Sequence, residues 1–148
     1  MTNNELFLSL LEIMKTGKAV NLKIAGWSMS PMLLPERDSL VLASTREKLK
    51  RGDVVLYQRD CGKYIVHRIY KINQERFFMI GDGETKIEGP LKRDQIFASA
   101  IGAYRKDRYL DFNSFRWKAF TQVWLLVRPF RSVIRRCVTG AYRFVRHF

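Results

Sequence analysis

The sequence predicts a mainly β fold: a small, coiled antiparallel sheet with a helix before it and a helical tail after it. Between Val20 and Tyr104, short apolar runs alternate with turns that contain Gly or Asp. After Phe112 the apolar residues recur every three or four positions, which is the period of a helix. The chain has 148 residues, enough for one domain with its own core. We expect an N-terminal helix over residues 1–18, a β domain over 19–104 and a tail over 105–148.

The first segment has the pattern of a helix. Asn3 or Asn4 can cap its N-terminus, apolar residues follow at helical spacing, and Gly17 predicts an end after Lys15. We expect the apolar stripe of this helix to pack on the core. The second alternative is that the helix covers a substrate cleft.

The β domain is predicted from short runs of apolar and β-branched residues. Turn signals such as Asp60-Cys61-Gly62 and Gly81-Asp82-Gly83 separate these runs, and such spacing is typical of antiparallel strands. We expect the sheet to fold onto itself, which protects its edges. The predicted strands are 20–25, 39–43, 54–57, 64–72, 77–80 and 96–103.

The tail is predicted to be a basic amphipathic helix with Trp and Phe on its apolar side. Pro129 should kink or split it, and Gly140 should weaken it. Such helices lie in the interface of anionic membranes. The alternative is a helix docked on the domain with its basic side in solvent. From Arg105 onward, the only carboxylates are Asp107 and Asp111, against Arg105, Lys106, Arg108, Arg116, Lys118, Arg128, Arg131, Arg135, Arg136, Arg143 and Arg146.

The composition limits the possible partners. A net charge of +13 and a pI near 10.1 indicate attraction to an anionic partner: nucleic acid, a membrane or an acidic peptide. Cys61 and Cys137 have no metal-ligand spacing and suggest no disulfide, so we expect neither a metal nor a cofactor. We see no signal peptide and no uncharged run long enough to cross a bilayer.

Three residues could form a hydrolytic site. Ser28 lies between a glycine and a proline at the end of a predicted strand, where a bent backbone exposes a nucleophile. His67, in a later strand, titrates near neutrality and can accept the serine proton, although a strand histidine is commonly structural. Asp82 could orient that imidazole, or it could simply form the turn; Glu88 is the second candidate carboxylate. His147 is close to the chain end, and we expect it to face solvent or an interface.

Four motifs resemble those of type I signal peptidases and the self-cleaving repressors related to them. Residues 26–33, Gly-Trp-Ser-Met-Ser-Pro-Met-Leu, are similar to the G-x-S-M-x-P-x-L motif, and 51–55 resemble the G-D-[VI]-[VI] motif. Residues 66–69, Val-His-Arg-Ile, resemble the histidine motif of the endoplasmic-reticulum and archaeal type, and 81–83 resemble the G-D-N motif. The motifs occur in the family's order over roughly the middle 80 residues.

The resemblance implies peptide-bond hydrolysis through an acyl-enzyme. By position, Ser28 is similar to the nucleophile, His67 to the general base and Asp82 to the acid of the G-D-N motif. Gly26 and Trp27 supply no side-chain donor for the oxyanion, so backbone N–H groups would have to hold it. Gly83 replaces the usual asparagine.

We therefore expect a serine endopeptidase that cleaves a signal or leader peptide. The family's spanning anchor is not seen, so the basic tail is expected to hold the enzyme peripherally on the cytoplasmic face of a membrane. The helix-turn-helix domain of the repressors is not seen either, so no specific nucleic acid is expected. The alternative function is a non-catalytic β module whose basic tail binds an acidic partner, a membrane or nucleic acid.

Overall fold

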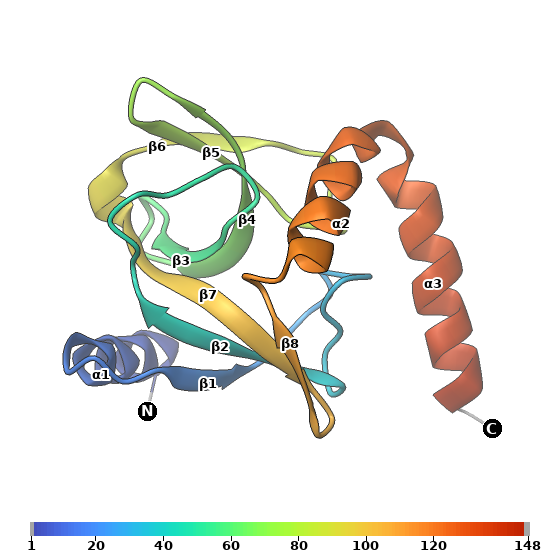
Figure 1. Cartoon of the computed structure of the whole chain (residues 1–148), viewed down its shortest axis with the longest axis horizontal. Helices are drawn as coiled ribbons and strands as arrows, with labels where there is room; N and C mark the ends of the chain where they lie inside the picture. The colour runs from blue at the N-terminus through green and yellow to red at the C-terminus, as the bar shows by residue number, and fades with distance from the viewer. Residues whose placement is uncertain (1, 147–148) are drawn as a thin grey trace.

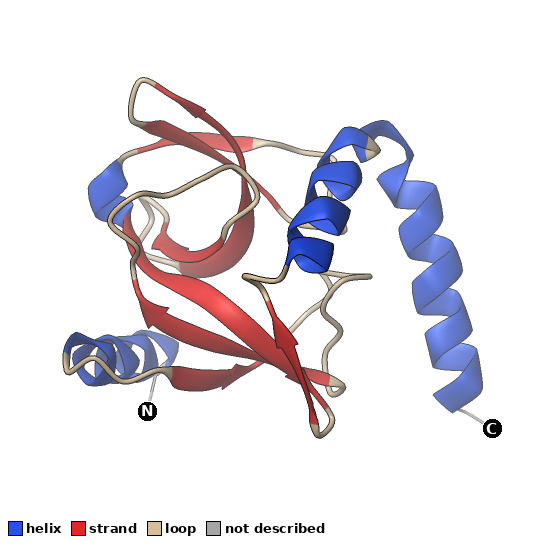
Figure 2. Cartoon of the chain, in the orientation of Figure 1, coloured by secondary structure: helices blue, strands red, loops and turns tan. Residues whose placement is uncertain are grey.

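An antiparallel β-sheet forms the centre of the protein, and helices lie at its periphery (Figure 1 and Figure 2). The computed structural model describes residues 2–146 and all of their side chains except those of Asn3 and Arg135; His147 lies outside this range. The sheet of the described residues has eight strands: seven run in the order β1-β2-β7-β3-β4-β5-β6, and the eighth, β8, pairs with the end of β7. The strands are β1 (Val20–Lys23), β2 (Asp38–Ser44), β3 (Val54–Gln58), β4 (Tyr64–Asn73), β5 (Arg76–Ile80), β6 (Glu88–Leu91), β7 (Ile96–Arg105) and β8 (Arg108–Asp111).

The predicted strands are confirmed, with ends that shift by one to two residues. The alternation of buried and less buried residues explains these strands: in β2, Leu40 and Leu42 are fully buried while their neighbours Val41 and Ala43 are half-buried.

The sheet is not closed. Its outermost strands, β1 and β6, do not pair with each other, and α1 packs beside β1 and β2 instead. The expectation of a sheet folded onto itself is therefore wrong in that respect, although β3 and β4 are strongly curved (Figure 1).

Helix α1 (Asn3–Lys15) ends where the sequence predicts, at Lys15, with Gly17 in a left-handed conformation. Its cap is not Asn3 or Asn4. Thr2 precedes the helix, its hydroxyl accepts a hydrogen bond from Glu5 N–H, and the Glu5 carboxylate accepts one from Thr2 N–H. This reciprocal capping box satisfies two backbone donors that the helix leaves unpaired.

The tail forms two helices rather than one. Helix α2 (Phe115–Leu126) ends in a short 3-10 turn, η2 (Arg128–Phe130), and α3 (Arg131–Arg146) follows. The break falls at Pro129, as predicted. A second 3-10 turn, η1 (Arg93–Gln95), precedes β7. Among the described residues, no helix is both long enough and apolar enough to span a bilayer.

Candidate active site

Ser28 lies in the turn that follows β1. The hydroxyl of Ser30 donates to the Trp27 carbonyl at 2.7 Å, and Leu33 N–H donates to the Met29 carbonyl at 2.9 Å. Met29, Ser30 and Leu33 are buried, whereas Ser28 is half-buried. Buried neighbours therefore fix the turn, and Ser28 itself stays partly exposed.

The loop over residues 81–83 packs directly against this turn. Gly83 N–H donates to the Ser28 carbonyl at 2.8 Å. A Cβ atom at Gly81 would lie 2.6 Å from that same carbonyl oxygen, so only glycine fits there. The two glycines of the Gly-Asp-Gly motif thus hold the backbone of the candidate nucleophile.

His67 comes from the middle of β4 and its side chain is only 4% exposed. In the β3–β4 hairpin, Val55 pairs with His67, so Tyr57, two residues further along β3, projects from the same face as His67. The Tyr57 hydroxyl lies 3.2 Å from His67 Nδ1 and donates to Glu88 Oε2 at 2.7 Å. The imidazole of His67, the hydroxyl of Tyr57 and the carboxylate of Glu88 are therefore connected in series, in that order.

This series determines the position of the imidazole proton. The hydroxyl of Tyr57 has one proton, which it donates to Glu88, so toward His67 it can only accept. Nδ1 of His67 must then carry the ring proton, and Nε2 keeps the lone pair. A general base needs that lone pair on the nitrogen that faces the substrate.

Charges and burial keep Tyr57 and Glu88 in these protonation states. Burial, followed by the neighbouring Glu88 carboxylate, raises the pKa of Tyr57 well above its ordinary value. Burial alone would raise the pKa of Glu88, but hydrogen bonds from Arg59 and Tyr57 outweigh it and lower that pKa. Arg59 binds Glu88 through Nε at 2.6 Å and Nη2 at 2.9 Å. Near neutral pH, Tyr57 is therefore a phenol and Glu88 a carboxylate.

The Nε2 side of His67 faces Glu84, whose Oε2 lies 4.0 Å away. Burial lowers the pKa of His67, and it does so more strongly than the Glu84 and Glu88 carboxylates raise it. The imidazole is therefore neutral at pH 7 and can accept a proton.

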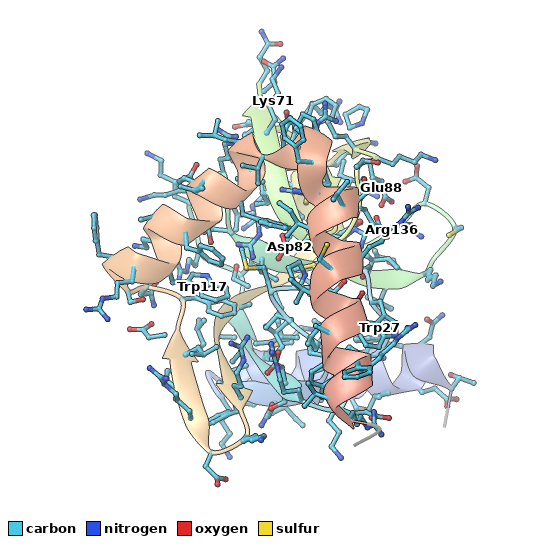
Figure 3. All side chains as sticks on the ribbon, turned by 90° about the vertical axis from the view of Figure 1, so that its right-hand side faces the viewer. Trp27, Lys71, Asp82, Glu88, Trp117 and Arg136 are labelled. Atoms are coloured by element: carbon cyan, nitrogen blue, oxygen red, sulfur yellow. The ribbon has the colours of Figure 1, made fainter. Side chains whose placement is uncertain are left out.

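The side chain of Asp82 binds Arg68 and forms no hydrogen bond with His67. Both of its oxygens accept hydrogen bonds from Arg68, at 2.7 Å each, and both side chains are completely buried. Successive strand residues project to opposite faces, so Arg68, and Asp82 with it, lies on the face of β4 opposite His67. The hydrogen bonds thus connect His67 to Tyr57 and Glu88 rather than to Asp82. In the view of Figure 3, Asp82 lies between the two C-terminal helices.

Ser28, His67 and Glu84 line one cavity of about 830 Å³, together with Arg59. Its remaining walls are mainly apolar and come mainly from α1, β1 and the first half of β4. Met14 and Leu11 of α1 pack on the core, as expected for the apolar stripe of this helix. Two strand edges meet the cavity: the outer edge of β1, and residues 64–67 of β4, which β5 does not reach. The apolar side chains are Leu6, Phe7, Leu10, Leu22, Ile24, Ala25, Met29, Leu40, Ile65 and Val66.

Ser28 Oγ forms no hydrogen bond with His67 or with any other described group of residues 2–146. Over the same residues, no cluster of three or more His, Cys, Asp or Glu side chains could hold a metal ion. Both cysteines are exposed and unpaired.

Comparisons with protein-family models, curated proteins and solved structures find no match to this chain. The candidate site is therefore supported by its own geometry and by the four sequence motifs.

The sequence did not single out Tyr57, Arg59 or Glu84. One signal for Tyr57 was present: a hairpin over Asp60-Cys61-Gly62 places a residue of the first strand diagonally opposite His67. Arg59 follows Tyr57 by two residues in the same hairpin, whereas Glu84 meets the site only through long-range folding.

Proposed function

We propose that the chain is a serine endopeptidase of the signal-peptidase-like type, with Ser28 as nucleophile and His67 as general base. One observation carries the proposal. Ser28 and His67 line the same cavity, and the hydrogen bond of Nδ1 to Tyr57 leaves the Nε2 lone pair of His67 for the serine proton. The motif order from Gly26 to Gly83 supports it independently.

The reaction would proceed through an acyl-enzyme. Ser28 Oγ attacks the scissile carbonyl while its proton passes to Nε2 of His67, which then returns the proton to the leaving amine. The resulting imidazolium is stabilised because Nδ1–H donates to Tyr57, whose hydroxyl donates to the Glu88 carboxylate. We assign the orienting role to Glu88 acting through Tyr57, and a structural role to Asp82. The N–H groups of Ser28 and Met29 have no acceptor among the described residues and are the candidate oxyanion donors.

The substrate class follows from the cavity. An extended peptide could pair with the outer edge of β1 or with residues 64–67 of β4, and its side chains would meet the apolar walls. Signal and leader peptides are rich in apolar residues, so a segment of that kind is the proposed substrate.

A fluorophosphonate probe tests the nucleophile, because it phosphonylates only an activated serine. We expect one adduct per chain, mapped to Ser28 by peptide mass spectrometry, and none in Ser28→Ala or in His67→Gln. Ser9→Ala, on the exposed side of α1, is the matched control and should react like the wild type. Cleavage of a mixture of apolar peptides should follow the same pattern. Equal peptide cleavage by wild type and Ser28→Ala would refute the proposal.

A second candidate is a module that binds a peptide in the same cavity without cleaving it. One observation favours this candidate: Ser28 Oγ forms no hydrogen bond with His67. Peptide binding by wild type and Ser28→Ala alike, with no adduct and no cleavage products, would establish it.

A further inference from the structure

The two C-terminal helices expose an unusual amount of apolar surface. Most of the large apolar side chains that are exposed in the described chain lie between Phe115 and Val145, rather than on the β-sheet or α1. Isolated exposed apolar residues are ordinary, but a concentration on one pair of helices marks an interaction site. We call six of these residues the outer apolar face: Phe115, Val123, Leu126, Phe130, Val133 and Phe144.

Helix α2 is apolar on two sides. Trp124 and Leu125 are buried against the β domain, whereas Phe115, Val123 and Leu126 are exposed, Leu126 by 72%. Residues 115, 119, 123 and 126 follow the spacing of one helix face, which is the side turned away from the domain. A helix that only covers the core would carry polar residues there.

Helix α3 packs Ile134 on the core near its start, and farther along it turns polar side chains toward the domain. Near its end, Arg143 stacks over the ring of Trp27 with its guanidinium 4.6 Å from the ring centroid, and Arg146 pairs with Glu36. Val133 and Phe144, on the other side, are 62% and 65% exposed. Figure 3 shows α3 crossing in front of the domain with Trp27 beside its lower end and Arg136 along its side.

The charge identifies the occupant of the outer apolar face. Residues 112–148 contain no Asp or Glu, and Arg116, Lys118 and Arg136 are exposed on α2 and α3. A second copy of the chain would bring two strongly cationic surfaces together, which is unfavourable. Nucleic acid would use the cations but leave the apolar side chains in water. An anionic lipid surface uses both, because acyl chains accept the apolar residues and headgroups accept the cations.

We propose that the outer apolar face of α2 and α3 binds the interface of an anionic lipid bilayer, with the helices lying on the membrane rather than crossing it. This site is separate from the cavity that contains Ser28, so it stands whether or not the chain is a peptidase. The sequence predicts membrane contact by one continuous helix, whereas this proposal assigns the contact to both α2 and α3.

Flotation of the full chain with vesicles tests the proposal. We expect binding to phosphatidylcholine vesicles that contain phosphatidylglycerol, and much weaker binding to phosphatidylcholine alone. The double variant Val133→Gln/Phe144→Gln should bind about tenfold less, because two side chains no longer enter the acyl region. A second pair on the other helix, Val123→Gln/Leu126→Gln, should show a similar loss.

The matched control is Leu8→Gln/Ile13→Gln on α1, whose side chains are 54% and 43% exposed. It removes comparable apolar surface elsewhere and should leave flotation unchanged. Thermal melting of each variant checks that the fold is intact, as expected for exposed positions.

Several outcomes would overturn the proposal. One is flotation of the α2 and α3 variants equal to wild type, and another is equal loss in the α1 control. A dimer in lipid-free solution that disappears in Val133→Gln/Phe144→Gln would assign the face to a second copy. Nucleic-acid binding that persists in these variants, without flotation of the wild type, would assign the charge to nucleic acid.

Discussion

His67 determines how the proposed chemistry depends on pH. Burial holds the pKa of His67 below its ordinary value of 6.5, and the nucleophile requires the neutral imidazole. The rate at which a fluorophosphonate modifies Ser28 should therefore decline with falling pH, with the midpoint of that decline below pH 6.5. In Glu84→Gln, the loss of a carboxylate that raises this pKa should move the decline to lower pH. A decline centred above pH 6.5 would contradict this assignment.

A substitution of Tyr57 distinguishes a role in positioning the general base from a role in binding the substrate. Tyr57→Phe keeps the ring and removes the oxygen that accepts from Nδ1 of His67, so the imidazole loses its fixed tautomer and orientation. We expect kcat to fall by roughly 10- to 100-fold with KM nearly unchanged, since orientation of a general base contributes on that scale. The measurement is steady-state cleavage of one peptide that the wild type cleaves in the mixture of apolar peptides. A change in KM alone would mean that Tyr57 contacts substrate.

Asp82 and Glu88 should differ in what they stabilise. Asp82→Asn leaves the fully buried Arg68 guanidinium without its counter-charge, and breaking such a pair costs about 3–5 kcal/mol of unfolding free energy. Glu88 is partly exposed, so Glu88→Gln should change the unfolding free energy much less while it reduces the rate of Ser28 modification. Denaturant unfolding and probe labelling of both variants give the comparison. Equal stability of Asp82→Asn and wild type would refute the structural role of Asp82.

At the scale of elements, the loop over residues 81–83 sets the position of the nucleophile turn. Gly81→Ala would drive a methyl group to 2.6 Å from the Ser28 carbonyl, so the backbone must move and Ser28 must move with it. We expect loss of most Ser28 labelling and a lower melting temperature. Gly140→Ala in α3 is the control, because its Cβ would meet nothing within 4 Å, and alanine favours the helix by about 1 kcal/mol. Normal labelling of Gly81→Ala would contradict the proposed contact.

Elements with a clear apolar period could be predicted from the sequence, and those held by backbone pairing alone could not. Strand β2 alternates Leu40 and Leu42 with less buried residues, and that alternation is visible in the sequence. Strand β8 (Arg108–Asp111) is almost wholly exposed and exists because its backbone pairs with β7, so its residues show no apolar alternation. Strand β6 was missed for a related reason, since Gly89 and Pro90 interrupt it.

Only part of the candidate site could be predicted from the sequence. Ser28 and His67 stand in local motifs, so the sequence alone identifies them. The link from His67 to Glu88 depends on Tyr57 reaching across a hairpin, and the separation of Asp82 from His67 depends on which face of β4 Arg68 occupies. Both are long-range side-chain arrangements that a motif does not encode. The proposal of Asp82 as the orienting group followed the motif, whereas the hydrogen bonds favour Glu88.

At the scale of the whole molecule, a buried polar network joins the C-terminal helices to the loop over residues 81–83. Arg68 donates to Thr121 of α2, and the Trp124 indole N–H donates to the Asp82 carbonyl at 3.0 Å. Arg131, completely buried at the start of α3, donates to the Gly81 carbonyl. Helix α2 and the first residue of α3 are therefore integral to the β domain, whereas most of α3 lies outside it.

Truncation distinguishes these two parts of the tail. A chain that ends at Ser132 keeps Trp124, Thr121 and Arg131, so its unfolding free energy should stay within about 1–2 kcal/mol of wild type, because α3 buries little beyond Arg131 and part of Ile134. A chain that ends at Asn113 exposes Arg68 and Asp82 and loses the buried Trp124, so we expect it to be unfolded or to melt far below wild type. Circular dichroism melting of both chains measures this difference. Equal melting temperatures would show that α2 is a detachable appendage, and the position of the Gly81–Gly83 loop would then need another explanation.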